Sequence, residues 1–221
     1  MIKRELYMNR IRPFIGGELI KVMTGIRRSG KSVMLELIKE ELAEAGVAPS
    51  QMISINFEDM RYSHLQTATA LHDEIIKRAE GIEGKAYLFF DEIQEVEGWE
   101  KCVNSLRVAL DCDIYITGSN AKLLSGELAT YIGGRYVEFV IYPFSFAEFL
   151  ELYHTIAPSD SIQQCFQKYL LAGGMPYLAN LRYEEEPSRQ YLTDLFNSVQ
   201  LKDIVKRNKI RDIDLLERII A

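Results

Sequence analysis

The feature that most constrains this chain is a phosphate-binding-loop pattern close to its N-terminus. The segment Thr24–Ser32 reads T-G-I-R-R-S-G-K-S and fits G-x-x-x-x-G-K-[ST]. It follows an apolar run, Leu19–Met23, that is typical of a buried strand, and it precedes Ser32–Ala45, where apolar residues recur at helical spacing. Because such a loop joins a strand to a helix N-terminus, this context predicts an α/β fold that binds a nucleoside triphosphate.

Each residue type in the loop has a chemical reason. Gly25 and Gly30 carry no side chain, so the backbone can wrap the phosphates and aim its N–H groups at them. Lys31 adds a full charge at the β and γ phosphates, and the Ser32 hydroxyl is placed to ligate Mg²⁺. The predicted ATP-binding residues are Gly25, Ile26, Arg27, Arg28, Ser29, Gly30, Lys31 and Ser32, with the Arg27 and Arg28 side chains expected to point outward toward a neighbouring element.

An acidic pair predicts the second half of the site. The apolar run Tyr87–Phe90 ends in Asp91 and Glu92. At the end of a buried strand, Asp91 is positioned to hold Mg²⁺ through water, and Glu92 can polarise a water for attack on the γ-phosphate. The alternative is a solvated strand end. The phosphate loop upstream favours the catalytic interpretation, and with it hydrolysis over simple binding.

Three further polar residues are candidates for the same site. Asn56 closes a second predicted strand and Ser119 follows a fourth, so either can contact the attacking water or the γ-phosphate, although a plain turn also explains Ser119. Arg135 follows Gly133 and Gly134 directly before a fifth strand. A guanidinium there suits a finger or sensor for phosphate, and a surface arginine in a turn is the alternative.

The nucleobase is less well defined by the sequence. The guanine-selective pattern N-K-x-D is absent from the sequence, which leaves adenine as the default. The segment from Tyr7 to Phe14 has two interpretations, a stack on the base or a packing helix.

Composition excludes several classes of protein. The net charge of −6 argues against a surface devoted to a phosphate backbone, and the sequence has neither an 18-residue apolar run nor an apolar N-terminal stretch. We therefore expect a cytoplasmic protein that does not cross a membrane. The cysteine and histidine residues lack metal-ligand spacing, so buried free thiols are expected at Cys102, Cys112 and Cys165.

The order of the patterns predicts two parts of the chain. Strand and helix patterns alternate as far as residue 143, which predicts a mostly parallel five-stranded sheet flanked by helices. After Pro143, where Ser145 and Glu148 form a capping box, the patterns are helical only. We expect an α/β domain over 1–143 and a helical subdomain over 144–208. A further segment starts at 209–221, in which Asp212–Ala221 begins an amphipathic helix with Ile219 and Ile220 on its apolar face. The sequence stops inside this helix, so we expect a longer protein.

Taken together, the motifs resemble one family. Besides the loop and the acidic pair, they are Thr117–Ser119, Gly134–Tyr136, Tyr142–Phe149 and Gly173–Pro176. This ordered set, which spans essentially the whole chain, resembles the AAA-type ATPase core of a group of bacterial and archaeal ATP-binding proteins. The resemblance implies an ATP- and Mg²⁺-dependent P-loop NTPase. It also implies that 209–221 starts a winged-helix-like segment, with a nuclease-like C-terminal domain beyond it.

Three functions are compatible with these patterns. The first is an ATPase that couples ATP binding and hydrolysis to movement of the helical part or of C-terminal domains, with ATP and ADP as ligands and an oligomer left open. The second is a low-turnover nucleotide-dependent switch, with DNA as a candidate partner, and the third is a small-molecule kinase. Binding to DNA is suggested by a patch of basic residues, and the alternative interpretation of this patch is a solvated helix face. The patch consists of Lys202, Lys206, Arg207, Lys209 and Arg211.

Overall fold

The computed structural model describes residues 2–118 and 132–199, and the chain divides into two compact units, Met1–Tyr142 and Pro143–Ala221. The predictions for Ser119, for the basic patch at 202–211 and for the terminal isoleucines lie outside the described residues. Every helix within the described ranges falls short of the length and hydrophobicity that a membrane-spanning segment requires.

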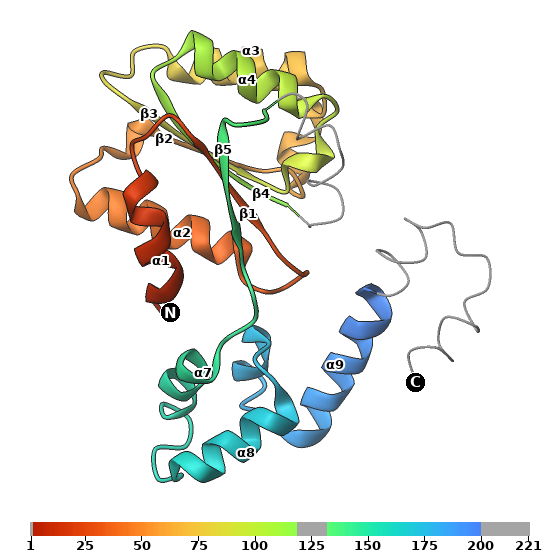
Figure 1. Ribbon diagram of the computed structural model, residues 1–221. Helices are drawn as coiled ribbons and strands as arrows, with labels where there is room; N and C mark the ends of the chain where they lie inside the picture. The colour runs from red at the N-terminus through yellow and green to blue at the C-terminus, as the bar shows by residue number, and fades with distance from the viewer. Residues whose placement is uncertain (1, 119–131, 200–221) are drawn as a thin grey trace. The chain divides into compact units, whose positions relative to one another are not determined.

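The first unit is built on a parallel sheet (Figure 1). Its order is β2-β3-β4-β1-β5, and every neighbouring pair is parallel, which confirms the predicted five-stranded α/β fold. The strands are β1 (Ile20–Thr24), β2 (Met52–Asn56), β3 (Ala86–Asp91), β4 (Cys112–Thr117) and β5 (Tyr136–Val140). Parallel strands need crossover connections, and from β1 to β4 these connections contain the helices that the sequence pattern predicted.

Helices cover both faces of this sheet (Figure 1). On one face α3 (Ala68–Ala79) and α4 (Trp99–Ala109) pack against Val22 and its neighbours; on the other, α1 (Glu5–Ile11) and α2 (Lys31–Glu44) pack against Met23. Successive strand residues point to opposite faces, so a strand covered on both sides is buried throughout. All the residues of β1 are buried, including Lys21 and Thr24.

The N-terminal segment is a packing helix, which decides between its two interpretations. Tyr7, Met8 and Ile11 are buried in the α2 core, and the ring of Phe14 meets Phe139 edge-on at 5.8 Å. With only 4% of Tyr7 exposed, its ring belongs to the core. Short 3-10 helices elsewhere in the unit are Arg12–Phe14, Pro49–Gln51, Met60–Leu65 and Ile93–Glu95.

The second unit is helical in its described part. It contains α7 (Phe146–Tyr153), α8 (Ile162–Ala172) and α9 (Glu185–Val199), with a 3-10 turn at Pro176–Ala179. The predicted capping box starts α7, since Ser145 N–H donates to Glu148 Oε2 at 2.9 Å and Ser145 Oγ accepts from Glu148 N–H. A separate aromatic core fills the unit, with Phe149, Tyr153, Cys165, Met175, Leu178 and Tyr183.

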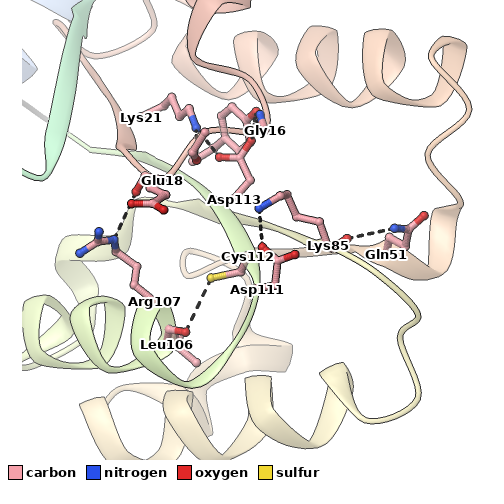
Figure 2. Close-up of polar contacts among 12 residues, drawn as sticks. Gly16, Glu18, Lys21, Gln51, Lys85, Leu106, Arg107, Asp111, Cys112 and Asp113 are labelled. Carbon is pink, nitrogen blue, oxygen red and sulfur yellow. Dashed lines mark hydrogen bonds and ion pairs between the residues drawn. The ribbon is translucent and has the colours of Figure 1, made fainter.

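Polar contacts join the amino ends of the strands (Figure 2). Asp113 of β4 pairs with Lys21 of β1, both side chains being fully buried, and it also accepts from Gly16 N–H and Tyr115 O–H at 2.7 Å each. Burial lowers the pKa of Lys21, and the charge of Asp113 opposes that effect. Lys85 and Asp111 form a second ion pair nearby. This edge of the sheet is therefore tied together by partnered charges.

Candidate functional site

The phosphate loop lies at the opposite, carboxyl edge of the sheet, between β1 and α2. Gly25 adopts φ 143°, and a Cβ there would lie 2.2 Å from the carbonyl oxygen of Ile141. Gly30 caps α2 in the left-handed region with φ 99°. Both conformations are easily reached only by glycine, so the loop needs these two residues for its shape.

Lys31 is buried within this loop. Its Nζ donates to the carbonyls of Gly25 and Ile26 at 3.2 Å each, and the residue is 5% exposed. Burial lowers the pKa of Lys31, while the negative charges of Glu92 and Asp91 act in the opposite direction. The ammonium therefore lies within electrostatic reach of the acidic pair.

The other loop residues divide by exposure. Ile26, Arg27 and Arg28 are exposed, which agrees with the expectation that the two arginines point outward. Ser29 is buried, and Ser32 is exposed in the first turn of α2.

Three strand ends meet at Asp91. The residue is 6% exposed, and its carboxylate accepts hydrogen bonds from Asn56 Nδ2 of β2 at 3.1 Å and from Thr117 Oγ1 of β4. Thr117 Oγ1 in turn accepts the backbone N–H of Glu92 at 3.0 Å. Because β4 lies between β1 and β3 in the sheet, its last residue comes between the loop and the acidic pair. The predicted residue Asn56 is thus brought directly to Asp91.

Glu92 has an unusual backbone. It adopts φ 55° and ψ 46° in the left-handed region, which is uncommon for a residue other than glycine. Its carboxylate oxygen Oε2 accepts from Gln94 Nε2. Backbone strain of this kind persists where the surroundings impose it and often accompanies functional groups. The backbone of the residue proposed as the base is thus held in place by its surroundings, and its catalytic role stays a prediction.

The structure places Arg135 away from the phosphate loop. Its carbonyl accepts the N–H of Ile20, the first residue of β1, so Arg135 lies at the amino edge of the sheet. Its Nη1 donates to Asn104 Oδ1 at 2.8 Å. At about 3.3 Å per residue, β1 separates this edge from the phosphate loop by roughly 13 Å. Arg135 therefore lies away from the phosphate loop of its own chain, and its role on phosphate, which the sequence left open between its own chain and a neighbouring subunit, stays a prediction.

Thr117 is the site residue that sequence reasoning missed. The segment from Thr117 onward was identified as a polar strand end, but the candidate role was given to Ser119. The available signal was a hydroxyl that directly closes a fully buried strand. Gln94 carried a weaker signal, because a glutamine two residues after an acidic pair has many surface interpretations.

The sequence of this chain matches a known protein family and two uncharacterised proteins. Residues 18–150 match a family model described as AAA domain, and these residues include the loop, the acidic pair and all the strands of the sheet. The chain belongs to the AAA domain family. An uncharacterised protein of Haemophilus influenzae is 40% identical over 221 residues, which is 100% of this chain and 54% of that protein. An uncharacterised protein of Methanocaldococcus jannaschii is 34% identical over 203 residues, covering 88% and 44%.

Solved structures share the AAA fold with this chain. AMPPCP-bound DnaA from Aquifex aeolicus superimposes with a TM-score of 0.51 at 13% identity, over 99% of this chain and 68% of that one. A RuvB mutant from Thermotoga maritima gives 0.53 at 14% identity, over 96% and 72%. At these identities the likeness shows the fold alone. The chain spans about half the length of the curated relatives it matches.

Proposed function

We propose that this chain is the ATPase module of a longer protein and that it couples binding and hydrolysis of ATP to a conformational change in the C-terminal part. The observation that carries the proposal is the convergence of Lys31, Asp91 and Glu92 at the carboxyl edge of one parallel sheet. Open α/β sheets bind their ligands at this edge. The fold neighbour DnaA from Aquifex aeolicus was solved with the nucleotide analogue AMPPCP, which supports the choice of ligand.

The loop has the properties that a polyphosphate requires. Its glycine backbone follows a path that a Cβ at Gly25 would block, and α2 begins directly after it, so N–H groups and the helix dipole favour an anion there. The bonds from Lys31 to two loop carbonyls are long, at 3.2 Å, and phosphate oxygens are stronger acceptors for an ammonium. Lys31 is thus already beside the position where we place the β and γ phosphates.

Oxygen donors at the site fit Mg²⁺. Within the described residues no three His, Cys, Asp or Glu side chains are grouped to hold a metal. Mg²⁺ is usually bound through one or two protein oxygens together with water and substrate phosphates, so Ser32 and Asp91 would suffice. When bound, the ion neutralises charge on the phosphates. Asn56 and Thr117 fix the Asp91 carboxylate in one orientation.

Glu92 is assigned the role of general base. It would accept a proton from the water that attacks the γ-phosphate. Its backbone N–H is fixed by Thr117 and its carboxylate by Gln94, so the side chain is oriented from two sides.

Binding is tested by the substitution Lys31→Ala. Saturating Mg-ATP at about 100 times its dissociation constant should stabilise the wild-type chain by about 2.7 kcal/mol. The variant should lose most of the accompanying thermal shift, because the charge at the β and γ phosphates is gone. Lys39→Ala, on the same helix but outside the loop, is the matched control and should keep the shift. An unchanged shift in Lys31→Ala would remove the loop from the proposal.

Hydrolysis is tested by Glu92→Gln. Because Glu92 acts on water and does not contact the nucleotide, the variant should keep the ATP affinity of the wild type and lose phosphate release. Equal turnover by both proteins would show that Glu92 is not the base. Turnover by the full-length wild type that is negligible with and without DNA would favour the second candidate, a nucleotide-dependent switch.

A further inference from the structure

We propose that Arg4 is a positioning residue that ties the phosphate loop to the end of the first unit, an inference that rests on the proposed nucleotide binding. Its guanidinium joins two segments that lie far apart in the sequence. Nη1 donates to the carbonyl of Ser29 in the loop at 2.9 Å, and Nη2 donates to the carbonyl of Tyr142 at 2.8 Å. Tyr142 is the last residue of the first unit, and the chain enters the second unit at Pro143.

The surroundings of Arg4 hold this guanidinium in place. The residue is 2% exposed, and its guanidinium carbon lies 4.6 Å from the centre of the Tyr7 ring. Its backbone is in the left-handed region, with φ 48° and ψ 47°, directly before α1. A buried charge and a strained backbone both cost free energy, so the native state retains them only where the neighbouring contacts compensate.

The contact with Ser29 acts on the phosphate site through one peptide group. In a trans peptide the C=O and the following N–H are coplanar and point in opposite directions. When Arg4 fixes the Ser29 carbonyl, it also fixes the direction of the Gly30 N–H, one of the donors that we assign to the phosphates. A Cβ built on Gly30 would lie 3.4 Å from Arg4 Nη1, so the guanidinium is packed against this peptide.

The contact with Tyr142 acts on the junction, by which we mean residues 139–145, where the chain passes from the first unit to the second. Tyr142 N–H donates to Tyr7 Oη at 3.0 Å, and Tyr142 C=O accepts from Arg4, so the N-terminal segment holds both peptide groups of this residue. The following proline further restricts the backbone of Tyr142. A guanidinium is a rigid plane with a fixed fork of donors. A movement of the Ser29 carbonyl on nucleotide binding must therefore shift the fork or break its bond to the junction.

Two substitutions at Arg4 separate this role from a merely structural one. Arg4→Gln removes the charge and the fork. Arg4→Lys keeps the charge, but the ammonium is a point donor that cannot match both carbonyls in one plane. Arg10→Gln changes an exposed arginine of the adjacent helix α1 and is the matched control. Affinity is measured by titration with a fluorescent Mg-ATP analogue, and the junction by hydrogen exchange of peptides that cover 139–145, with and without the nonhydrolysable analogue AMPPCP.

In the wild type and in Arg10→Gln, we expect AMPPCP to change the hydrogen-exchange rate of the backbone amides in 139–145 by about tenfold. Arg4→Gln should bind the ATP analogue at least about tenfold more weakly, and Arg4→Lys should recover part of that affinity. In both Arg4 variants, saturating AMPPCP should leave exchange at the junction unchanged. If Arg4→Gln does not fold, the result for Arg4→Lys decides alone.

Two results overturn the inference. One is wild-type affinity together with wild-type junction response in the Arg4 variants. The other is a junction response that persists when affinity has fallen. A wild-type chain that binds no nucleotide would contradict the proposed function itself, whereas binding that Arg4 does not influence contradicts only the role of Arg4.

Discussion

Two aspartates of the same sheet show how neighbouring residues decide the use of a carboxylate. Asp113 is fully buried and faces the cation of Lys21, with two further donors from Gly16 and Tyr115, so its charge is compensated. Asp91 accepts hydrogen bonds from neutral groups of Asn56 and Thr117, which orient it without neutralising it. The first arrangement stabilises the fold. The second leaves a carboxylate charge at the edge where we propose Mg²⁺.

Breaking the buried ion pair of Lys21 and Asp113 should strongly destabilise the folded chain. Asp113→Asn should lower the free energy of unfolding by about 3–5 kcal/mol, because Lys21 is left as an uncompensated buried charge. The double variant Lys21→Met/Asp113→Leu should recover much of that loss. Urea unfolding measures both, and Arg61→Gln, which breaks the surface pair with Asp59, should leave stability nearly unchanged. Equal effects of the buried and surface variants would contradict the assignment.

At the scale of elements, the connection from β1 to α2 has its shape fixed by close approach of backbones. Gly25 lies so near the Ile141 carbonyl that no larger residue fits, and Gly174 in the second unit lies equally near the Phe144 carbonyl, where a Cβ would come within 2.0 Å. Gly25 follows the end of β1, and Gly174 follows the end of α8, so in both cases the chain leaving an element passes close to the backbone of a distant segment. Glycine at both positions is therefore a packing requirement, and at Gly25 the φ of 143° is a second one.

Gly25→Ala should consequently distort the loop and abolish the thermal shift by Mg-ATP. Gly46→Ala is the matched control, since Gly46 has φ 91° but no atom within 4 Å of its added Cβ. Gly46→Ala should lower the free energy of unfolding only by the strain of an alanine in the left-handed region, about 1–2 kcal/mol, and should keep nucleotide binding. Differential scanning fluorimetry with and without Mg-ATP compares the two. Retained binding in Gly25→Ala would show that the loop tolerates the contact.

At the scale of the molecule, the cysteines report on two separate cores. Cys102 and Cys112 are buried in the sheet core against α3 and α4, and Cys165 is buried in the aromatic core of the helical unit. Burial raises the pKa of Cys102 to about 12 and of Cys112 to about 11. The thiolate is the reactive form, so these two thiols are protected both by access and by protonation at neutral pH.

We predict slow labelling of the native chain by a thiol reagent at pH 8. Along a urea gradient, Cys102 and Cys112 should become reactive together, and Cys165 at a lower urea concentration, because the core formed by the described residues of the helical unit is the smaller one. Mass spectrometry of labelled peptides identifies each thiol. The raised pKa values also stabilise the folded chain below about pH 8.5, and that contribution is lost as the pH rises toward 11 and 12. If all three thiols became reactive at the same urea concentration, the prediction that the two units unfold separately would be contradicted.

Local chemistry made much of this protein predictable from its sequence. The loop Gly25–Ser32 and the acidic pair depend on residue types at fixed spacing, and the strands and helices depend on hydrophobic periodicity and on caps such as Ser145 with Glu148. These signals act over a few residues, so one sequence carries them in full. The α/β class and the meeting of the loop and the acidic pair at one edge of the sheet were predictable for that reason, and the roles of these residues stay predictions.

Strand order and edge were decided only in three dimensions. Nothing local places β4 between β1 and β3, and that placement is what brings Thr117 to Asp91 and Glu92. The two glycines before Arg135 do not show at which edge of the sheet the arginine lies, but its hydrogen bond with Ile20 puts it at the edge away from the phosphate loop. Arg4 meets Ser29 and Tyr142 across 25 and 138 positions of sequence. Contacts of this range arise from packing of the whole first unit, which no short pattern encodes.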